Sequence, residues 1–158
     1  MIELSLFENL YDRTPKRMEF SSWANFEQLL YNVHKKKGQK FDKSKPKQRS
    51  SPLISPAVFK SGTTRKNDNV EYWSQWCCVD VDDYTVSKSV QDDMTDKYGQ
   101  YYFVCYSTAS SSKENPKFRL VFPLTCNVPA DKIKHFWYAL NTELDSIGDR
   151  IKPSLFVK

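Results

Sequence analysis

The sequence predicts a mixed α/β (α+β) fold, because three β-rich segments surround one pair of carboxylates and two amphipathic helices accompany them. The β-rich segments cover residues 76–84, 101–108 and 117–125, with the carboxylates in the first. Apolar residues recur at three- and four-residue spacing after residue 22 and again after residue 129, which indicates helices. A chain of 158 residues with 15% aromatic content can build a core within a single domain.

Residues 1–70 predict a small β-α-β unit. Apolar and polar residues alternate over residues 1–8, which indicates a strand, and a polar, basic loop follows over residues 9–18. The serine pair at 21–22 is suited to cap a helix that extends to about residue 36. The apolar face of this helix consists of Trp23, Phe26, Leu29, Leu30 and Val33.

The last part of this unit is a strand over residues 52–60. Pro56 interrupts the strand, since proline cannot donate to a strand ladder. Residues 61–64 have the composition of a turn, and a polar connector over residues 65–70 then leads to the carboxylate strand.

Residues 71–158 predict a second unit. A short helix between Tyr84 and Gly99 separates the first two β-rich segments, with the glycine as its C-terminal stop. Pro129 opens the last helix, and a short strand over residues 155–157 follows it. The order β-α-β-β-α-(β) is that of the ferredoxin-like, RNA-recognition-motif-like (RRM-like) arrangement. The apolar stripe of the last helix consists of Ile133, Phe136, Trp137, Leu140 and Leu144.

The net charge of +5 and the pI near 8.9 favour a polyanionic partner such as DNA. No apolar run approaches the roughly 20 residues of a membrane span, and the N-terminus lacks the features of a signal peptide. The four cysteines have no C-x-x-C spacing, which predicts reduced, mostly buried thiols in a cytoplasmic protein rather than a zinc site. They are Cys77, Cys78, Cys105 and Cys126.

A basic segment, residues 35–49, carries eight lysines or arginines against one aspartate. Two interpretations are open: a solvated surface loop, or an arm that contacts DNA phosphates and gives salt-dependent affinity. Together with two residues of the polar connector, the DNA-binding candidates are Lys35, Lys36, Lys37, Lys40, Lys43, Lys45, Lys47, Arg49, Arg65 and Lys66.

Asp80 and Asp82 share one face of their strand, roughly 6–7 Å apart, because alternate side chains of a strand point the same way. Burying them is costly unless a cation compensates, and carboxylate oxygens suit Mg²⁺ or Mn²⁺. Two alternatives stay open. The aspartates can form a solvated strand end, and Arg119 can be their ion-pair partner.

Three stretches carry a resemblance to a known family. They are residues 59–70, the Asp-Val-Asp of residues 80–82, and residues 106–124, which read Tyr-Ser-Thr-Ala-Ser-Ser-Ser-Lys-Glu-Asn-Pro-Lys-Phe-Arg-Leu-Val-Phe-Pro-Leu. The acidic motif alone is common, but its combination with the third stretch is much more specific. Over roughly residues 55–150 the chain resembles the archaeo-eukaryotic primase superfamily. It is most similar to the primase-polymerase-like domains in replication proteins of phages, plasmids and other mobile elements.

The resemblance implies a primase-polymerase-like core that acts as a metal-dependent nucleotidyltransferase with Mg²⁺ or Mn²⁺. The family's metal-binding, catalytic acidic pair falls on Asp80 and Asp82. Its third catalytic and metal-binding carboxylate follows the last long helix. Asp149 is the first candidate for that position, and Asp145 is the second.

The family's second motif, a Ser-His pair at the incoming nucleotide, falls on Ser110 and Ser111, so a serine stands where the histidine is expected. Its basic, phosphate-contacting strand position falls on Arg119. Lys113 and Lys117 are further candidates for phosphate binding, since cationic side chains hold a triphosphate. Serine carries no charge, which leaves the activity open, and an ordinary turn is the alternative interpretation of this serine-rich segment.

Two functions follow from this pattern. One is a primase or primase-polymerase, and the other is a catalytically impaired domain that binds DNA or an origin in a replication initiator. Members of the family often continue into a helicase, so the chain is expected to be a fragment of a longer protein or to have a helicase partner. Four aromatic residues are interpreted as sheet packing rather than as stacking platforms for single strands. These residues are Tyr101, Tyr102, Phe103 and Tyr106.

Overall fold

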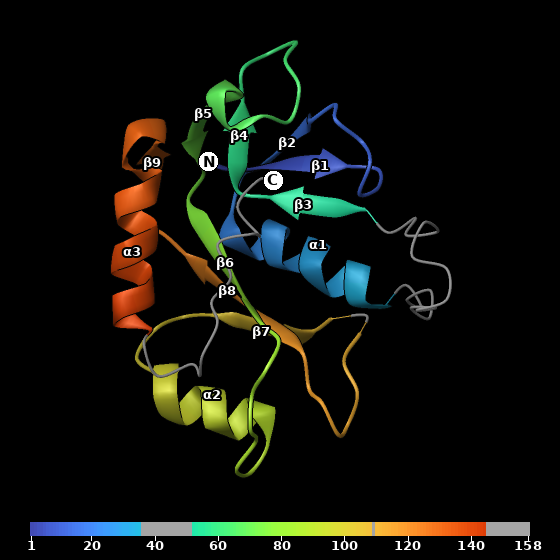
Figure 1. The fold of residues 1–158 in the computed structure, drawn as a ribbon, viewed down its shortest axis with the longest axis vertical. Coiled ribbons are helices and arrows are strands. Elements are labelled where there is room, and N and C mark those ends of the chain that lie inside the picture. The colour runs from blue at the N-terminus through green and yellow to red at the C-terminus, as the bar shows by residue number, and fades with distance from the viewer. Residues whose placement is uncertain (36–51, 109, 145–158) are drawn as a thin grey trace.

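The computed structural model describes residues 1–35, 52–108 and 110–144, which form three small antiparallel sheets and three α-helices (Figure 1). The predicted mixed α/β class is therefore confirmed. The last predicted strand and most of the basic segment lie outside these described residues. No helix within the described part of the chain is both long and apolar enough to cross a membrane.

The first sheet has the order β2-β1-β3, with β1 (Ile2–Phe7) in the centre and β2 (Lys16–Phe20) and β3 (Leu53–Ser55) on either side. The prediction for residues 9–18 was wrong, because β2 begins inside the segment assigned to a loop. The N-terminal unit is therefore β-β-α-β rather than β-α-β. Its polar strand was missed because β2 lies at the edge of the sheet, where only every second side chain turns toward the core.

Helix α1 (Trp23–Lys35) follows β2 and confirms the predicted helix. The Ser22 hydroxyl caps it, since Ser22 Oγ accepts from the Asn25 backbone N–H at 3.3 Å. Its buried face joins the first sheet to the carboxylate strand. The buried residues of this core cluster are Ile2, Leu4, Phe26, Leu30, Trp76 and Val121.

The second sheet has the order β4-β5-β9, formed by β4 (Ala57–Phe59), β5 (Val70–Trp73) and β9 (Val128–Pro129). Pro56 divides the predicted strand of residues 52–60 into β3 and β4, which belong to different sheets. Strand β5 pairs with β4 on one side and β9 on the other. The two predicted units, which meet near residue 70, are therefore joined in this one sheet.

Two turns refine the predictions for this region. The turn after β4 contains Gly62 at φ +72°, a left-handed conformation that glycine adopts readily. Pro129 ends β9 instead of opening the last helix. A 3₁₀ turn (Ala130–Lys132) intervenes, and α3 begins at Ile133 and extends to Glu143.

The third sheet has the order β6-β8-β7 and carries the acidic pair. Strands β6 (Trp76–Val81) and β7 (Val104–Ser107) both pair antiparallel with β8 (Phe118–Pro123), which lies between them. Helix α2 (Val90–Tyr98) connects β6 to β7. The predicted order β-α-β-β is present from β6 to β8, and β9 of the second sheet then intervenes before α3. The central position of β8 makes β6, α2 and β7 a split β-α-β arrangement.

The two faces of the third sheet are covered differently. One face is apolar along its length and packs against α2 and α3, which appear below and to the left of the sheet in Figure 1. The other face contributes Trp76 and Val121 to the core cluster of α1, and Cys78, Val104 and Tyr106 pack against that cluster. The polar residues of β6 and β8 occupy the rest of that face, so the candidate site begins where the cover of α1 ends.

Candidate nucleotide and metal site

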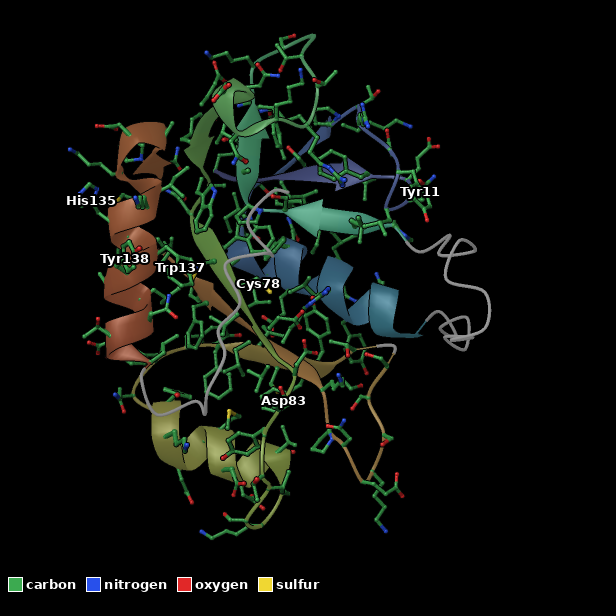
Figure 2. The ribbon with its side chains drawn as sticks, viewed as in Figure 1. Tyr11, Cys78, Asp83, His135, Trp137 and Tyr138 are labelled. Atoms are coloured by element: carbon green, nitrogen blue, oxygen red, sulfur yellow. The ribbon has the colours of Figure 1, made fainter. Side chains whose placement is uncertain are left out.

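The acidic face of β6 changes from core to surface over a few residues. The Trp76 residue is 1% exposed, the Asp80 side chain 18%, and the Asp82 side chain 27%. Figure 2 shows Cys78 along the strand and Asp83 beyond its end, where the loop to α2 begins. The shared face predicted from the alternate spacing of the aspartates places both near this open end of the sheet.

Two basic residues lie opposite the aspartates: Arg119 in β8 and Lys117 immediately before that strand. Asp80 and Arg119 are direct cross-strand partners, and Arg119 Nε donates to Asp80 Oδ1 at 3.3 Å. Lys117 Nζ lies 3.5 Å from Asp82 Oδ1. The predicted phosphate-binding cations and the predicted metal ligands therefore meet on one face. Arg119 is thus an ion-pair partner of the acidic pair, as one of the two alternatives proposed.

Tyr106 completes a row across three strands, since it is the cross-strand partner of Arg119 on the side away from Asp80. Burial raises the pKa of the Tyr106 phenol, and the neighbouring Arg119 guanidinium counteracts part of that increase. Burial disfavours the charge of Arg119, but Tyr106, Cys78 and Asp80 outweigh it and raise the pKa of the guanidinium. Arg119 is therefore a permanent cation held between a carboxylate and a phenol.

Burial also raises the pKa of Asp80 above its usual 3.8, with Asp82 acting in the same direction and Arg119 against it. The carboxylate is thus short of solvation and gains from any cation placed beside it. Burial raises the pKa of the Cys78 thiol to about 12, so this thiol is neutral at pH 7.

The hairpin between β7 and β8 places the second predicted motif beside this row. Ser111 Oγ accepts from the Lys117 backbone N–H at 2.9 Å, and the Thr108 N–H donates to the Lys117 carbonyl at 2.8 Å. Ser110 Oγ lies 3.4 Å from the Thr108 hydroxyl, and Lys113 is exposed in the turn. The turn interpretation thus holds for Ser111, whose hydroxyl closes the hairpin.

Several predicted site residues lie elsewhere or outside the described residues. Asp145 and Asp149, and the basic candidates from Lys36 to Arg49, fall outside, and for Lys35 the structure describes only its place at the end of α1. Arg65 donates to the Leu10 carbonyl at 3.0 Å and lies 5.0 Å from the centre of the Phe7 ring. These contacts fix Arg65 to the loop after β1. Lys66 beside it is exposed.

The aromatic and cysteine predictions hold in part. Strand β7 begins at Val104, so Tyr101 and Tyr102 precede it and are exposed. The Phe103 ring packs 5.8 Å from that of Phe122, as a packing role requires. Cys77 is buried, but Cys126 is exposed, which corrects the prediction that the thiols are mostly hidden.

The acidic pair is the part of the site that could hold a divalent cation. Within the described ranges, no group of three or more His, Cys, Asp or Glu side chains converges on one point. Asp80 and Asp82 supply two carboxylates, and Mg²⁺ is commonly held by one or two carboxylates together with substrate phosphates. The acidic pair fits a cation of that kind, which a phosphate on Arg119 or Lys117 would share.

Sequence reasoning assigned Tyr106 to packing and missed its place beside Arg119. The signal that could have found it is the strand register, because a hairpin closed by Thr108 and Lys117 puts residues 106 and 119 opposite each other. Comparison with known proteins finds no matching family model, no matching curated protein and no matching solved structure. The function must therefore be inferred from the site itself and from the sequence resemblance.

Proposed function

We propose that this chain is the primase-polymerase-like, metal-dependent nucleotidyltransferase domain of a DNA replication protein from a mobile genetic element. One observation carries the proposal: two carboxylates and two cations alternate across adjacent strands at the open end of one sheet face. This combination suits a ligand that is itself a phosphate–cation complex, which is the chemistry of a nucleoside triphosphate.

Each side chain has a task in this proposal. Asp80 and Asp82 hold the divalent cation, which when bound stabilises charge on the attacking and leaving oxygens. Arg119 binds phosphate oxygens through its planar guanidinium, and Lys117 adds a point charge beside it. The half-buried setting of these groups strengthens both interactions, because fewer water molecules screen them. Asp149, outside the described residues, is the proposed third carboxylate.

The same proposal names the partners. DNA is the template, nucleotides are the substrates, Mg²⁺ or Mn²⁺ is the cofactor, and the site of action is the cytoplasm. The net charge of +5 supports a polyanionic partner. The basic segment supports an arm that contacts phosphates, and a helicase domain or partner would supply unwound DNA.

A second candidate is a DNA- or origin-binding module that has lost the chemistry. The hydrogen bond from the Lys117 N–H to Ser111 Oγ favours it, since the residue at the position of the expected histidine is occupied in closing a turn. In this case Arg119 and Lys117 serve DNA phosphates, and the acidic pair positions them.

Calorimetry and a DNA gel shift decide between these candidates. Under the first, the protein binds Mn²⁺, and the double variant Asp80→Ala/Asp82→Ala loses the binding heat. With Mn²⁺ present, the wild-type protein also binds ATP, and the Asp80→Asn substitution abolishes this ATP binding. Under the second, wild type shifts DNA in a gel but binds no nucleotide, and Asp80→Asn leaves DNA binding intact or stronger. Asp83→Asn is the matched control, because Asp83 is an exposed acid next to the pair.

A further inference from the structure

The basic side chains of the candidate site already have partners. The Arg119–Asp80 distance is 3.3 Å and the Lys117–Asp82 distance 3.5 Å. Both are longer than the roughly 2.7–2.9 Å of a strong charge-assisted hydrogen bond. All four side chains are between 18% and 30% exposed. Neither pair is therefore at the distance of its strongest interaction, and either member can exchange its partner for an incoming ligand.

In each ion pair, the carboxylate is suited to bind a metal cation and the basic side chain is suited to bind phosphate. A carboxylate attracts a divalent cation, and a guanidinium or ammonium attracts phosphate. Phosphate must therefore compete with Asp80 for Arg119, while a cation must compete with Arg119 for Asp80. A cation that binds the carboxylate releases the basic side chain for phosphate, and a phosphate that binds the basic side chain releases the carboxylate for the cation.

We propose that the Arg119–Asp80 and Lys117–Asp82 ion pairs couple cation binding at the two aspartates to phosphate binding at the two basic residues, so that each ligand raises the affinity for the other. This inference rests on the proposed function, since it takes the ligands to be a divalent cation and a nucleoside triphosphate. Thermodynamic linkage requires the two enhancements to be equal. Tyr106 adjoins Arg119 from the third strand, so the guanidinium keeps a neighbour when Asp80 turns to the cation.

The first arm of the test measures ATP binding by the 158-residue protein in EDTA, without divalent cations. Asp80→Asn keeps the shape of the side chain and removes the charge that competes for Arg119. The affinity for metal-free ATP is expected to rise about three- to tenfold. Asp82→Asn, which releases Lys117, acts in the same direction. Asp83→Asn removes an equal charge from an exposed neighbour and is expected to change the affinity less than about twofold.

The second arm measures Mn²⁺ binding without nucleotide. Arg119→Gln removes the competing cation, so the affinity of the acidic pair for Mn²⁺ is expected to rise about three- to tenfold. Lys134→Gln makes the same change of charge at an exposed position of α3 and leaves the affinity unchanged. Circular dichroism and thermal unfolding establish that each variant is folded before its affinity is interpreted.

The outcomes separate the coupling from the proposed function. Equal ATP affinities in EDTA for wild type, Asp80→Asn and Asp82→Asn overturn the coupling, even where wild type binds ATP with Mn²⁺. Failure of wild type to bind ATP with Mn²⁺ overturns the proposed function. In that case the second arm still decides: tighter Mn²⁺ binding by Arg119→Gln supports competition within the pair, and unchanged binding overturns it.

Discussion

The backbone N–H of Lys117 donates to the Ser111 hydroxyl at 2.9 Å, across the base of the hairpin between β7 and β8. The Lys117 side chain in turn lies 3.5 Å from Asp82. Position 111 is thus linked to the acidic pair through a single residue. Under the proposed function, a substitution at this position would act on the turn and on a bound nucleotide together, so paired variants are needed to separate the two effects.

Ser111→His is expected to raise nucleotide affinity in the presence of Mn²⁺, because an imidazolium can donate a charge-assisted hydrogen bond to phosphate. Such a bond contributes about 1.5–3 kcal/mol, or roughly one to two orders of magnitude in affinity. Ser111→Ala removes the same hydroxyl without adding a donor, and is expected only to lower stability by about 0.5–1.5 kcal/mol. Titration of a labelled nucleotide compares the two. Binding by Ser111→His no tighter than by Ser111→Ala contradicts the prediction.

Asp93 lies in the first turn of α2, and we expect its hydrogen bonds to make the start of this helix sensitive to acid. Its carboxylate accepts from the Ser87 hydroxyl at 2.6 Å and from the Ser87 N–H at 2.7 Å, and these bonds lower its pKa below the usual 3.8. A lowered pKa in the folded state contributes stability that is present above pH 3.8 and lost as the pH falls through the folded value. Urea unfolding should therefore show a higher free energy of unfolding for wild type than for Asp93→Asn at pH 7, and this difference should become smaller below about pH 4. A gap independent of pH argues against this role.

The elements with strong local patterns could be predicted from the sequence. Apolar stripes predicted α1 and α3, alternation predicted β1, and β-rich composition predicted β6. The strands that were missed, β2, β5 and β9, are short or polar, and each exists because another strand is there to pair with it. Val70–Trp73 becomes a strand between β4 and β9, partners that come from distant parts of the chain. The local sequence pattern of a short strand does not predict pairing with such distant partners.

The candidate site could be predicted in its composition but not in its pairing. The spacing of Asp80 and Asp82 predicted a shared face, and the resemblance pointed to Arg119 and Lys117. The register of β6, β7 and β8 decides which cation meets which carboxylate, and it also places Tyr106 beside Arg119. The third carboxylate and the basic segment lie outside the described residues, so they stay predictions.

The basic segment, residues 35–49, is expected to supply most of any non-specific affinity for DNA. If it engages about five phosphates, the logarithm of affinity should fall with the logarithm of salt concentration at a slope of about −4.5. Deleting the segment should flatten this slope. Fluorescence anisotropy with labelled duplex and single-stranded DNA measures it over a range of salt concentrations. A slope unchanged by the deletion would show that the segment is only a solvated surface.

Glu3 shows how pairing between strands can bury a charge that its own strand pattern would place in solvent. Strand β1 is central, and the Glu3 side chain is only 7% exposed. Its carboxylate accepts from Arg17 Nε at 2.7 Å and from the Tyr72 hydroxyl at 2.6 Å. Burial and this hydrogen bond raise the pKa of Tyr72 to about 12. Side chains of β1, β2 and β5 therefore meet in one polar cluster.

Glu3→Gln is expected to destabilise the protein, because it leaves the Arg17 guanidinium beside a neutral amide in a buried position. Breaking a fully buried pair costs about 3–5 kcal/mol, but Arg17 is 46% exposed and water screens it, so the expected loss is about 1–3 kcal/mol. Glu19→Gln is the matched control, since the Glu19 carboxylate lies 3.5 Å from Arg17 Nε but is 53% exposed. Its loss should stay below about 0.5 kcal/mol. Urea unfolding at pH 7 measures both, and equal losses would mean that solvent screens the Glu3 pair as fully as the exposed one.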